Sequence, residues 1–208
     1  MKYIFVTGAP GSKWSSVIKN IYYSPDIDRS DYREEWTYYH DASGEMQLMH
    51  LGAYFDPGMA CPLPEDLTVL TREQLEETFA YPFQSQESQG IRIIKSHIFS
   101  NHIDYLRKLF PEIPIVIVSR GDDACLGWWV KCGHFNITYP DYRDYFKDLK
   151  NMASIIKSQN LAIRQARAKH WAKSVEDNHD LCLQLGIDMP PREYKQNYQD
   201  NDIEVGIL

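Results

Sequence analysis

Short apolar runs, separated by stretches with helical spacing, are the clearest feature of the hydrophobic pattern in this chain. The three best-defined runs cover residues 2–7, 91–95 and 114–119, and turn-forming or polar residues follow each of them. Runs of this length that are bounded by Gly, Pro or Ser indicate buried strands rather than helices. We therefore predict three buried strands.

Apolar residues at helical spacing predict helices between and after these strands. Val17, Ile18 and Ile21 share one helical face, and Thr71 with Gln74 forms the pattern of a capping box. The predicted helices cover residues 14–23, 71–79, 100–110, 122–132, 141–170 and 173–185. Strands that alternate with helices favour parallel pairing and right-handed crossovers. The sequence therefore predicts an α/β fold with a central parallel sheet flanked by helices.

Two regions do not follow this alternation. Residues 25–65 show no clean period apart from a short predicted strand at 46–51 and a structured loop at 52–58. A long segment of this kind inside a compact domain is often functional, so we expect an acceptor-side wall or lid here. The tail at 190–208 is polar as far as residue 202, and we expect residues 203–208 to dock. We treat residues 1–208 as a single domain.

Composition and charge narrow the classes of function. The formal charge of −7 argues against a general nucleic-acid binder, which needs a basic surface. The four cysteines lack CxxC spacing, so we expect neither a metal site nor a disulfide framework, and a reducing, cytoplasmic setting fits. No apolar run approaches the roughly 20 residues of a membrane span, so we expect no membrane partner.

A glycine-containing loop joins the first predicted strand to the first predicted helix. It reads Gly8-Ala9-Pro10-Gly11-Ser12-Lys13-Trp14-Ser15-Ser16. Loops of this kind present backbone N–H groups and a helix N-terminus to phosphate groups. In the nucleotide-hydrolase motif G-x-x-x-x-G-K-[ST], Lys13 would stand at the second Gly and Trp14 at the Lys, which disfavours ATP or GTP hydrolysis. The loop predicts a P-loop-type, three-layer fold with a phosphate site.

The other two strands also end at polar groups. The second predicted strand continues into Lys95-Ser96-His97, and the third delivers Arg120. Ligands of open α/β sheets bind at the carboxyl ends of the strands. Three such ends predict a single site for a phosphorylated ligand, with a histidine available for chemistry.

These three motifs together resemble those of the P-loop sulfotransferases. That family transfers a sulfuryl group from 3'-phosphoadenosine 5'-phosphosulfate (PAPS) to an acceptor and releases 3'-phosphoadenosine 5'-phosphate (PAP). The residues from Gly8 to Ser15 match its first loop, x-x-P-[KR]-[ST]-G-[ST]-[ST], at Pro10, Ser12 and Ser15. Lys95-Ser96-His97-Ile98 matches its K-[ST]-H-[LFI] motif. Arg120, with an Asp offset by one residue, is similar to its R-[ND]-x-x-D motif. The resemblance covers roughly residues 1–20 and 90–130.

The chain departs from the family pattern at three places. The basic residue of the family loop falls at Gly11, and Lys13 is the candidate to supply this charge instead. The serine expected after Arg120 falls at Gly127 or Trp128. The family segment R-K-G-x-x-G-[DN]-W, which also holds the 3'-phosphate, is absent.

The resemblance implies a role for each matching residue. His97 would be the general base, because the pKa of an unperturbed imidazole lies near neutrality. Lys95 and Lys13 would stabilise negative charge on the transferring group, and Arg120 would hold the 3'-phosphate by a bidentate contact. No metal is expected. The predicted nucleotide-binding residues are Gly8, Ala9, Pro10, Gly11, Ser12, Lys13, Trp14, Ser15, Ser16 and Arg120.

Several alternatives stay open from the sequence. The first hypothesis is a PAPS-dependent sulfotransferase that acts on a hydroxyl or amine of a small-molecule or glycan acceptor. The second is a nucleotide or nucleoside kinase, and the third is an inactive sulfotransferase-like protein that binds a nucleotide. Arg120 could instead pair with Asp122 or Asp123 at the surface, and Trp14 could stack on adenine or pack in the core.

Overall fold

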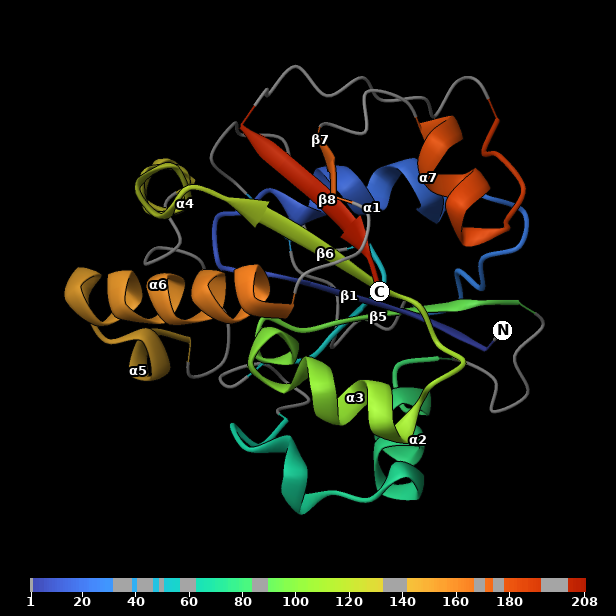
Figure 1. The fold of residues 1–208 in the computed structure, drawn as a ribbon, viewed down its shortest axis with the longest axis horizontal. Coiled ribbons are helices and arrows are strands. Elements are labelled where there is room, and N and C mark those ends of the chain that lie inside the picture. Colours follow the sequence, from blue (N-terminus) through green and yellow to red (C-terminus); the bar gives the residue numbers. More distant parts are fainter. Residues whose placement is uncertain are drawn as a thin grey trace.

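Four neighbouring parallel strands form the centre of the structure, and helices cover both faces (Figure 1). The protein is described from a computed structural model. The described residues are 2–31, 39–40, 47–48, 51–56, 63–83, 90–132, 142–166, 171–173, 178–191 and 202–208.

The strands and helices alternate over much of the chain, as the hydrophobic pattern predicts. The strands are β1 (Tyr3–Gly8), β2 (Tyr39–His40), β3 (Gln47–Leu48), β4 (Ala53–Tyr54), β5 (Arg92–Lys95), β6 (Ile115–Arg120), β7 (Trp171–Lys173) and β8 (Ile203–Ile207). The α-helices are α1 (Trp14–Tyr22), α2 (Arg72–Ala80), α3 (Ile103–Leu109), α4 (Asp122–Lys131), α5 (Tyr142–Phe146), α6 (Leu149–Ala166) and α7 (Asn178–Leu185). Two 3-10 helices are η2 (Leu67–Val69) and η3 (Ile98–His102).

The α/β fold with a sheet flanked by helices is confirmed, and the sheet is mostly parallel as predicted, but it is mixed. Its strand order is β4-β5-β1-β6-β8-β7, and the first four strands are parallel. The C-terminal strand β8 pairs antiparallel with β6 and with β7, and the arrows of β6 and β8 point in opposite directions in Figure 1. Antiparallel pairing is a matter of long-range register, which the local pattern of apolar residues does not encode. The expectation that residues 203–208 dock is confirmed.

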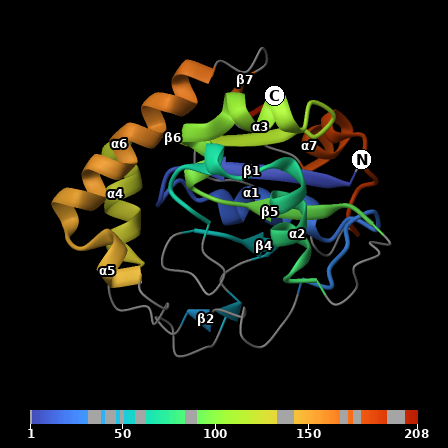
Figure 2. The same ribbon diagram turned by 90° about the horizontal axis from the view of Figure 1, so that it is seen from below.

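The two faces of β1 contribute to two separate clusters of buried side chains. Ile4 and Val6 pack with residues of α1, α4 and α7 on one face. Tyr3 and Phe5 pack with residues of α2, η3 and α3 on the other. In Figure 1, α1 and α7 lie above the sheet and α2 and α3 below it, and Figure 2 looks onto the face that α2 and α3 cover. Side chains along β1 point alternately to the two faces of the sheet, and both faces are buried. This explains why the sequence of β1 is a continuous apolar run.

Several predicted boundaries differ from those in the structure. The long helix predicted at 141–170 is two helices, α5 and α6, because Lys147 between them has a left-handed backbone with φ of 59°. Asp148 then accepts a hydrogen bond from the N–H of Asn151 and begins α6. The helix predicted from residue 173 is also too long, since residues 171–173 form β7 and α7 begins at Asn178. The capping box of Thr71 and Gln74 is confirmed.

The predicted wall or lid at 25–65 is described only in part. Within the strand predicted at 46–51, residues 47–48 form β3. β4, which joins the main sheet, consists of residues that we expected to form a loop. Residues 57 and 58 of that loop lie outside the described residues. None of the helices in the described ranges combines the length and apolar character that a membrane span requires.

Candidate functional site

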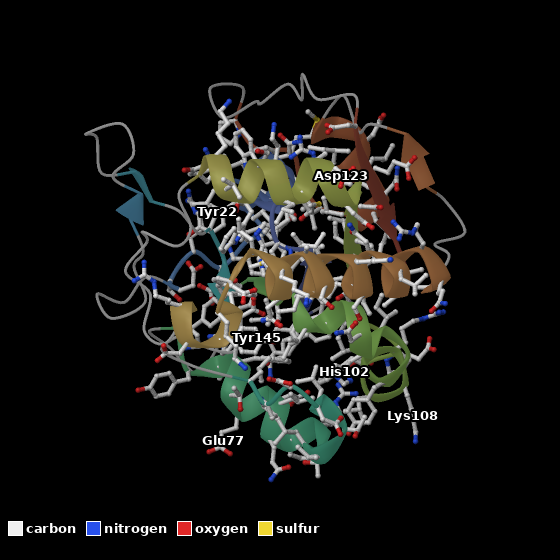
Figure 3. The ribbon with its side chains drawn as sticks, turned by 90° about the vertical axis from the view of Figure 1, so that its left-hand side faces the viewer. Tyr22, Glu77, His102, Lys108, Asp123 and Tyr145 are labelled. Carbon is white, nitrogen blue, oxygen red and sulfur yellow. The ribbon has the colours of Figure 1, made fainter. Side chains whose placement is uncertain are left out.

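The carboxyl ends of four parallel strands meet at one edge of the sheet. β1 lies between β5 and β6, with Val6 opposite Lys95 and Gly8 opposite Val118. The chain leaves β1 toward the side of β4 and leaves β6 toward the side of β8, so the connections diverge between β1 and β6. Such a point of divergence is the usual ligand site of an open α/β sheet. Figure 3 looks onto the side toward which β6 points, where α4 and α6 run one above the other.

The glycines of the first loop are required by close backbone approach. A Cβ on Gly8 would lie 2.6 Å from the Ser12 hydroxyl oxygen and 2.8 Å from the Val118 carbonyl oxygen. Gly11 has φ of +80°, and a Cβ there would lie 2.0 Å from the carbonyl oxygen of Cys125 in α4. No residue with a side chain fits at Gly11 without moving α4. This contact accounts for a glycine rather than a basic residue at this position of the loop.

The loop offers hydroxyl and amide donors at the start of α1. Ser12 is buried, and its hydroxyl has no hydrogen-bond partner in the described parts of the chain. Ser15 and Ser16, in the first turn of α1, are half-buried. Lys13 is the N-cap residue, with a left-handed backbone at φ of 62°, and its side chain does not cap the helix. An uncapped helix N-terminus beside a buried, unpartnered hydroxyl favours an anion.

Lys13 and Trp14 point to different neighbours. The Lys13 ammonium nitrogen lies 4.0 Å from the centroid of the Trp128 ring in α4, which is a cation–π contact. The Trp14 ring is buried and stacks on the His97 imidazole, with centroids 3.9 Å apart and planes 12° apart. Of the two readings of Trp14, packing therefore accounts for the ring in this structure.

The His97 imidazole is held in a single tautomer. Its Nδ1 lies 2.5 Å from the carbonyl oxygen of Gly8, and a carbonyl oxygen can only accept, so Nδ1 carries the proton. Burial, with a smaller contribution from the positive charge of Lys95, lowers the pKa of His97 to about 3, and the hydrogen bond to Gly8 opposes this shift. At neutral pH the ring is therefore uncharged, with its lone pair on Nε2.

Lys95 is buried between aromatic rings. Its ammonium donates to the Leu51 carbonyl oxygen at 2.7 Å and lies 5.7 Å from the Trp14 ring centroid and 5.6 Å from that of Tyr54. Burial lowers the pKa of Lys95 to about 7, while the carboxylates of Asp31 and Asp56 oppose this shift. A bound anion would therefore favour the charged ammonium.

Sequence reasoning missed Asp56 and Tyr54, which also belong to this site. Asp56 is buried at the carboxyl end of β4 and accepts hydrogen bonds from the Ser96 hydroxyl at 2.7 Å, the His97 N–H at 2.9 Å and the Tyr54 hydroxyl at 2.7 Å. Its Oδ2 lies 3.9 Å from His97 Nε2. Burial raises the pKa of Asp56 to about 7, and the Ser96 and Tyr54 bonds oppose this. The apolar residues before Asp56 were the available signal for a fourth strand end.

Arg120 reaches the first loop and the C-terminal segment. Its Nε donates to Asp202 Oδ2 at 2.7 Å, and its Nη1 donates to the Gly11 carbonyl oxygen at 3.2 Å. Asp122 is not its partner, because Asp122 accepts from Asn160 and lies 3.6 Å from Arg164. The guanidinium therefore links the first loop to the C-terminal segment.

Comparisons with known proteins add nothing to this geometry. No protein-family model, curated protein or solved structure matches the chain. Within the described ranges, no group of three or more His, Cys, Asp or Glu side chains could hold a metal ion. The functional argument therefore rests on the site itself.

Proposed function

We propose that the protein is a sulfotransferase that uses PAPS as its donor. The observation that supports this most directly is the meeting of three groups at adjacent strand ends: the loop that starts at Gly8, the neutral His97 beside Lys95, and Arg120. As part of the same proposal, the fold is of the P-loop type, with the β1–loop–α1 unit as its phosphate-binding part.

The residues of the loop fit a doubly anionic nucleotide. The unpartnered hydroxyl of Ser12 and the first-turn N–H groups of α1 would bind the 5'-phosphate. Arg120, which already contacts the loop through Gly11, would bind the 3'-phosphate. Because Gly8 and Gly11 have no side chains, the backbone of the loop can lie directly against β6 and α4.

His97 would take the proton of the acceptor hydroxyl or amine on Nε2. When bound, PAPS supplies the sulfuryl group: the acceptor atom bonds to sulfur, and the bond from sulfur to the phosphate oxygen breaks with its electron pair left on PAP. The Gly8 carbonyl holds the proton on Nδ1 and so keeps the Nε2 lone pair available. The stacked Trp14 ring covers one face of the imidazole and excludes water from it.

Lys95 would supply positive charge near the transferring group. Its ammonium is buried, so its attraction to an anion is weakly screened. A small-molecule or glycan acceptor with a hydroxyl or amine group remains part of the proposal. Lys13, whose ammonium lies over the Trp128 ring, would add a second positive charge beside the first loop.

A second candidate is a protein that binds PAP and transfers nothing. Two observations favour it: the ammonium of Lys13 is held over Trp128, and Arg120 is paired with Asp202. Both contacts draw cations of the predicted donor site toward groups of the chain itself. Binding and turnover must therefore be measured separately.

Calorimetric titration with PAP, against ADP plus magnesium, tests the donor site first. We expect micromolar binding of PAP and little binding of ADP, because Arg120 would read the 3'-phosphate. Incubation with ³⁵S-labelled PAPS and a panel of phenols, amino alcohols and monosaccharides then tests transfer. Binding of PAP without any labelled product would favour the second candidate, and absence of PAP binding would contradict both.

A further inference from the structure

Asp56 links the backbone of His97 to the nitrogen that would receive the proton. We propose that Asp56 is a positioning residue for proton transfer: its carboxylate fixes the Ser96–His97 turn and is the counter-ion of the imidazolium that forms when His97 Nε2 takes the acceptor proton. This inference rests on the proposed function, because it assigns a role to Asp56 in that reaction.

The first half of the role follows from hydrogen bonds that cross between two strands. Asp56 follows β4, and its Oδ1 accepts from the Ser96 hydroxyl at 2.7 Å and from the His97 N–H at 2.9 Å. Both donors come directly after β5. The carboxylate thus fixes the direction in which the chain leaves β5, and with it the position of the imidazole.

The second half follows from where a proton can go. Nδ1 of His97 already donates to Gly8, so an added proton must bind at Nε2. Oδ2 of Asp56 lies 3.9 Å from Nε2, too far for a direct hydrogen bond but close enough to stabilise a positive charge. Because His97 is buried against Trp14 and Tyr54, an imidazolium without a counter-ion would be strongly disfavoured.

Groups from four elements bear on the charge of Asp56. Lys95 and His97 come from β5 and the turn after it, Tyr54 from β4, and Tyr145 from α5. Burial raises the pKa of Asp56 to about 7. The carboxylate form that the role requires therefore increases as the pH rises through this value. Because the bound donor anion keeps Lys95 charged over the same range, turnover should rise with the carboxylate form.

Asp56→Asn tests the charge with little change in shape. The Asn oxygen can still accept from Ser96 and from the His97 N–H, but the counter-ion is lost. In an assay of PAP release from PAPS with an acceptor from the panel present, we expect kcat to fall by about 10²-fold or more, with KM for PAPS unchanged. The rise of kcat through about pH 7 should also disappear. Asp104→Asn, the same change at an exposed position of α3, should keep the wild-type values.

Tyr54→Phe separates the proposed role from a merely structural one. It removes one donor to Oδ2 and keeps the carboxylate, so the pKa of Asp56 rises and the rise of kcat should move to higher pH. A merely structural role predicts lower kcat in both variants, with the pH profile unmoved. That result would overturn the inference.

An NMR measurement without donor or acceptor distinguishes failure of the inference from failure of the proposed function. In protein labelled with ¹⁵N-histidine, the Nε2 resonance of His97 should show a step near pH 7 that is clearly smaller in Asp56→Asn, where Lys95 alone of the two neighbours titrates in this range. If the wild type binds no PAP and releases none from PAPS in the presence of the acceptor panel, the proposed function fails. If it releases PAP and Asp56→Asn keeps the wild-type kcat and pH profile, or if the NMR step is absent, the inference on Asp56 fails.

Discussion

Replacing Gly11 with alanine should destabilise the protein far more than the same change at a second glycine nearby. Gly11 has a left-handed backbone with φ of +80°, which costs a residue with a side chain roughly 1–2 kcal/mol. The added Cβ would also lie 2.0 Å from the Cys125 carbonyl oxygen. Forcing extra atoms into packed regions typically costs a further ~1–3 kcal/mol. We therefore expect the free energy of unfolding to fall by about 2–5 kcal/mol.

Gly127→Ala is the matched control, because Gly127 is exposed on α4 and a Cβ there would meet nothing within 4 Å. In a helix, alanine is favoured over glycine by roughly 0.5–1 kcal/mol, so this variant should be more stable than the wild type. Urea denaturation followed by tryptophan fluorescence measures both changes. In thermal denaturation, each kcal/mol should shift Tm by about 2–4 °C for a chain of this size.

Equal unfolding midpoints for the two variants would refute the reasoning, because the predicted shifts have opposite signs. The same result would remove the explanation for the missing basic residue in the loop. If the reasoning holds, Gly11→Lys cannot restore the sulfotransferase pattern without displacing α4, since its Cβ meets the same carbonyl oxygen.

Three further predictions concern the proposed reaction and the charge of His97. His97→Ala should abolish transfer in the ³⁵S assay while calorimetry shows PAP binding nearly intact, and equal transfer would remove His97 from the base role. Arg120→Ala should weaken PAP far more than adenosine 5'-phosphosulfate, which lacks the 3'-phosphate; equal losses would mean that Arg120 does not read that group. Between about pH 6.5 and pH 3 the unfolded chain protonates His97 while the folded chain keeps it neutral, so wild-type stability includes a component that decreases as the pH falls. Urea denaturation across this range should show that His97→Gln lacks this component, and identical pH dependence of the two proteins would contradict it.

The local sequence pattern was sufficient to predict those elements whose formation depends mainly on residues within the same segment. The continuous apolar run of β1, the spacing of Val17, Ile18 and Ile21, and the capping box at Thr71 all predict what the structure contains. Each of these features depends on interactions between residues a few positions apart or on burial of a whole strand. Both leave a pattern in the sequence of one short segment.

Features that depend on distant partners could not be predicted in this way. β4 has only two residues, so the apolar residues before Asp56 are a weak signal for a strand, and the place of β4 in the sheet depends on pairing with β5. Lys147 ends α5 through a left-handed backbone that its residue type does not favour. The stacking of Trp14 on His97 likewise joins residues that only the fold brings together.

The ion pair between Arg120 and Asp202 decides whether Arg120 is available to a nucleotide. In the pairing of β6 with β8, Arg120 lies opposite Ile203, so the register brings Asp202 beside the guanidinium. The Asp202 side chain is 45% exposed and the Arg120 side chain only 9%, so we take about 1 kcal/mol, the upper end of the range for exposed ion pairs, as the contribution of this pair. Displacement of Asp202 by a phosphate group would therefore weaken PAP binding by at most about fivefold. Asp202→Asn should accordingly strengthen PAP binding by no more than this factor, whereas a larger gain would mean that the C-terminal segment holds the donor site closed.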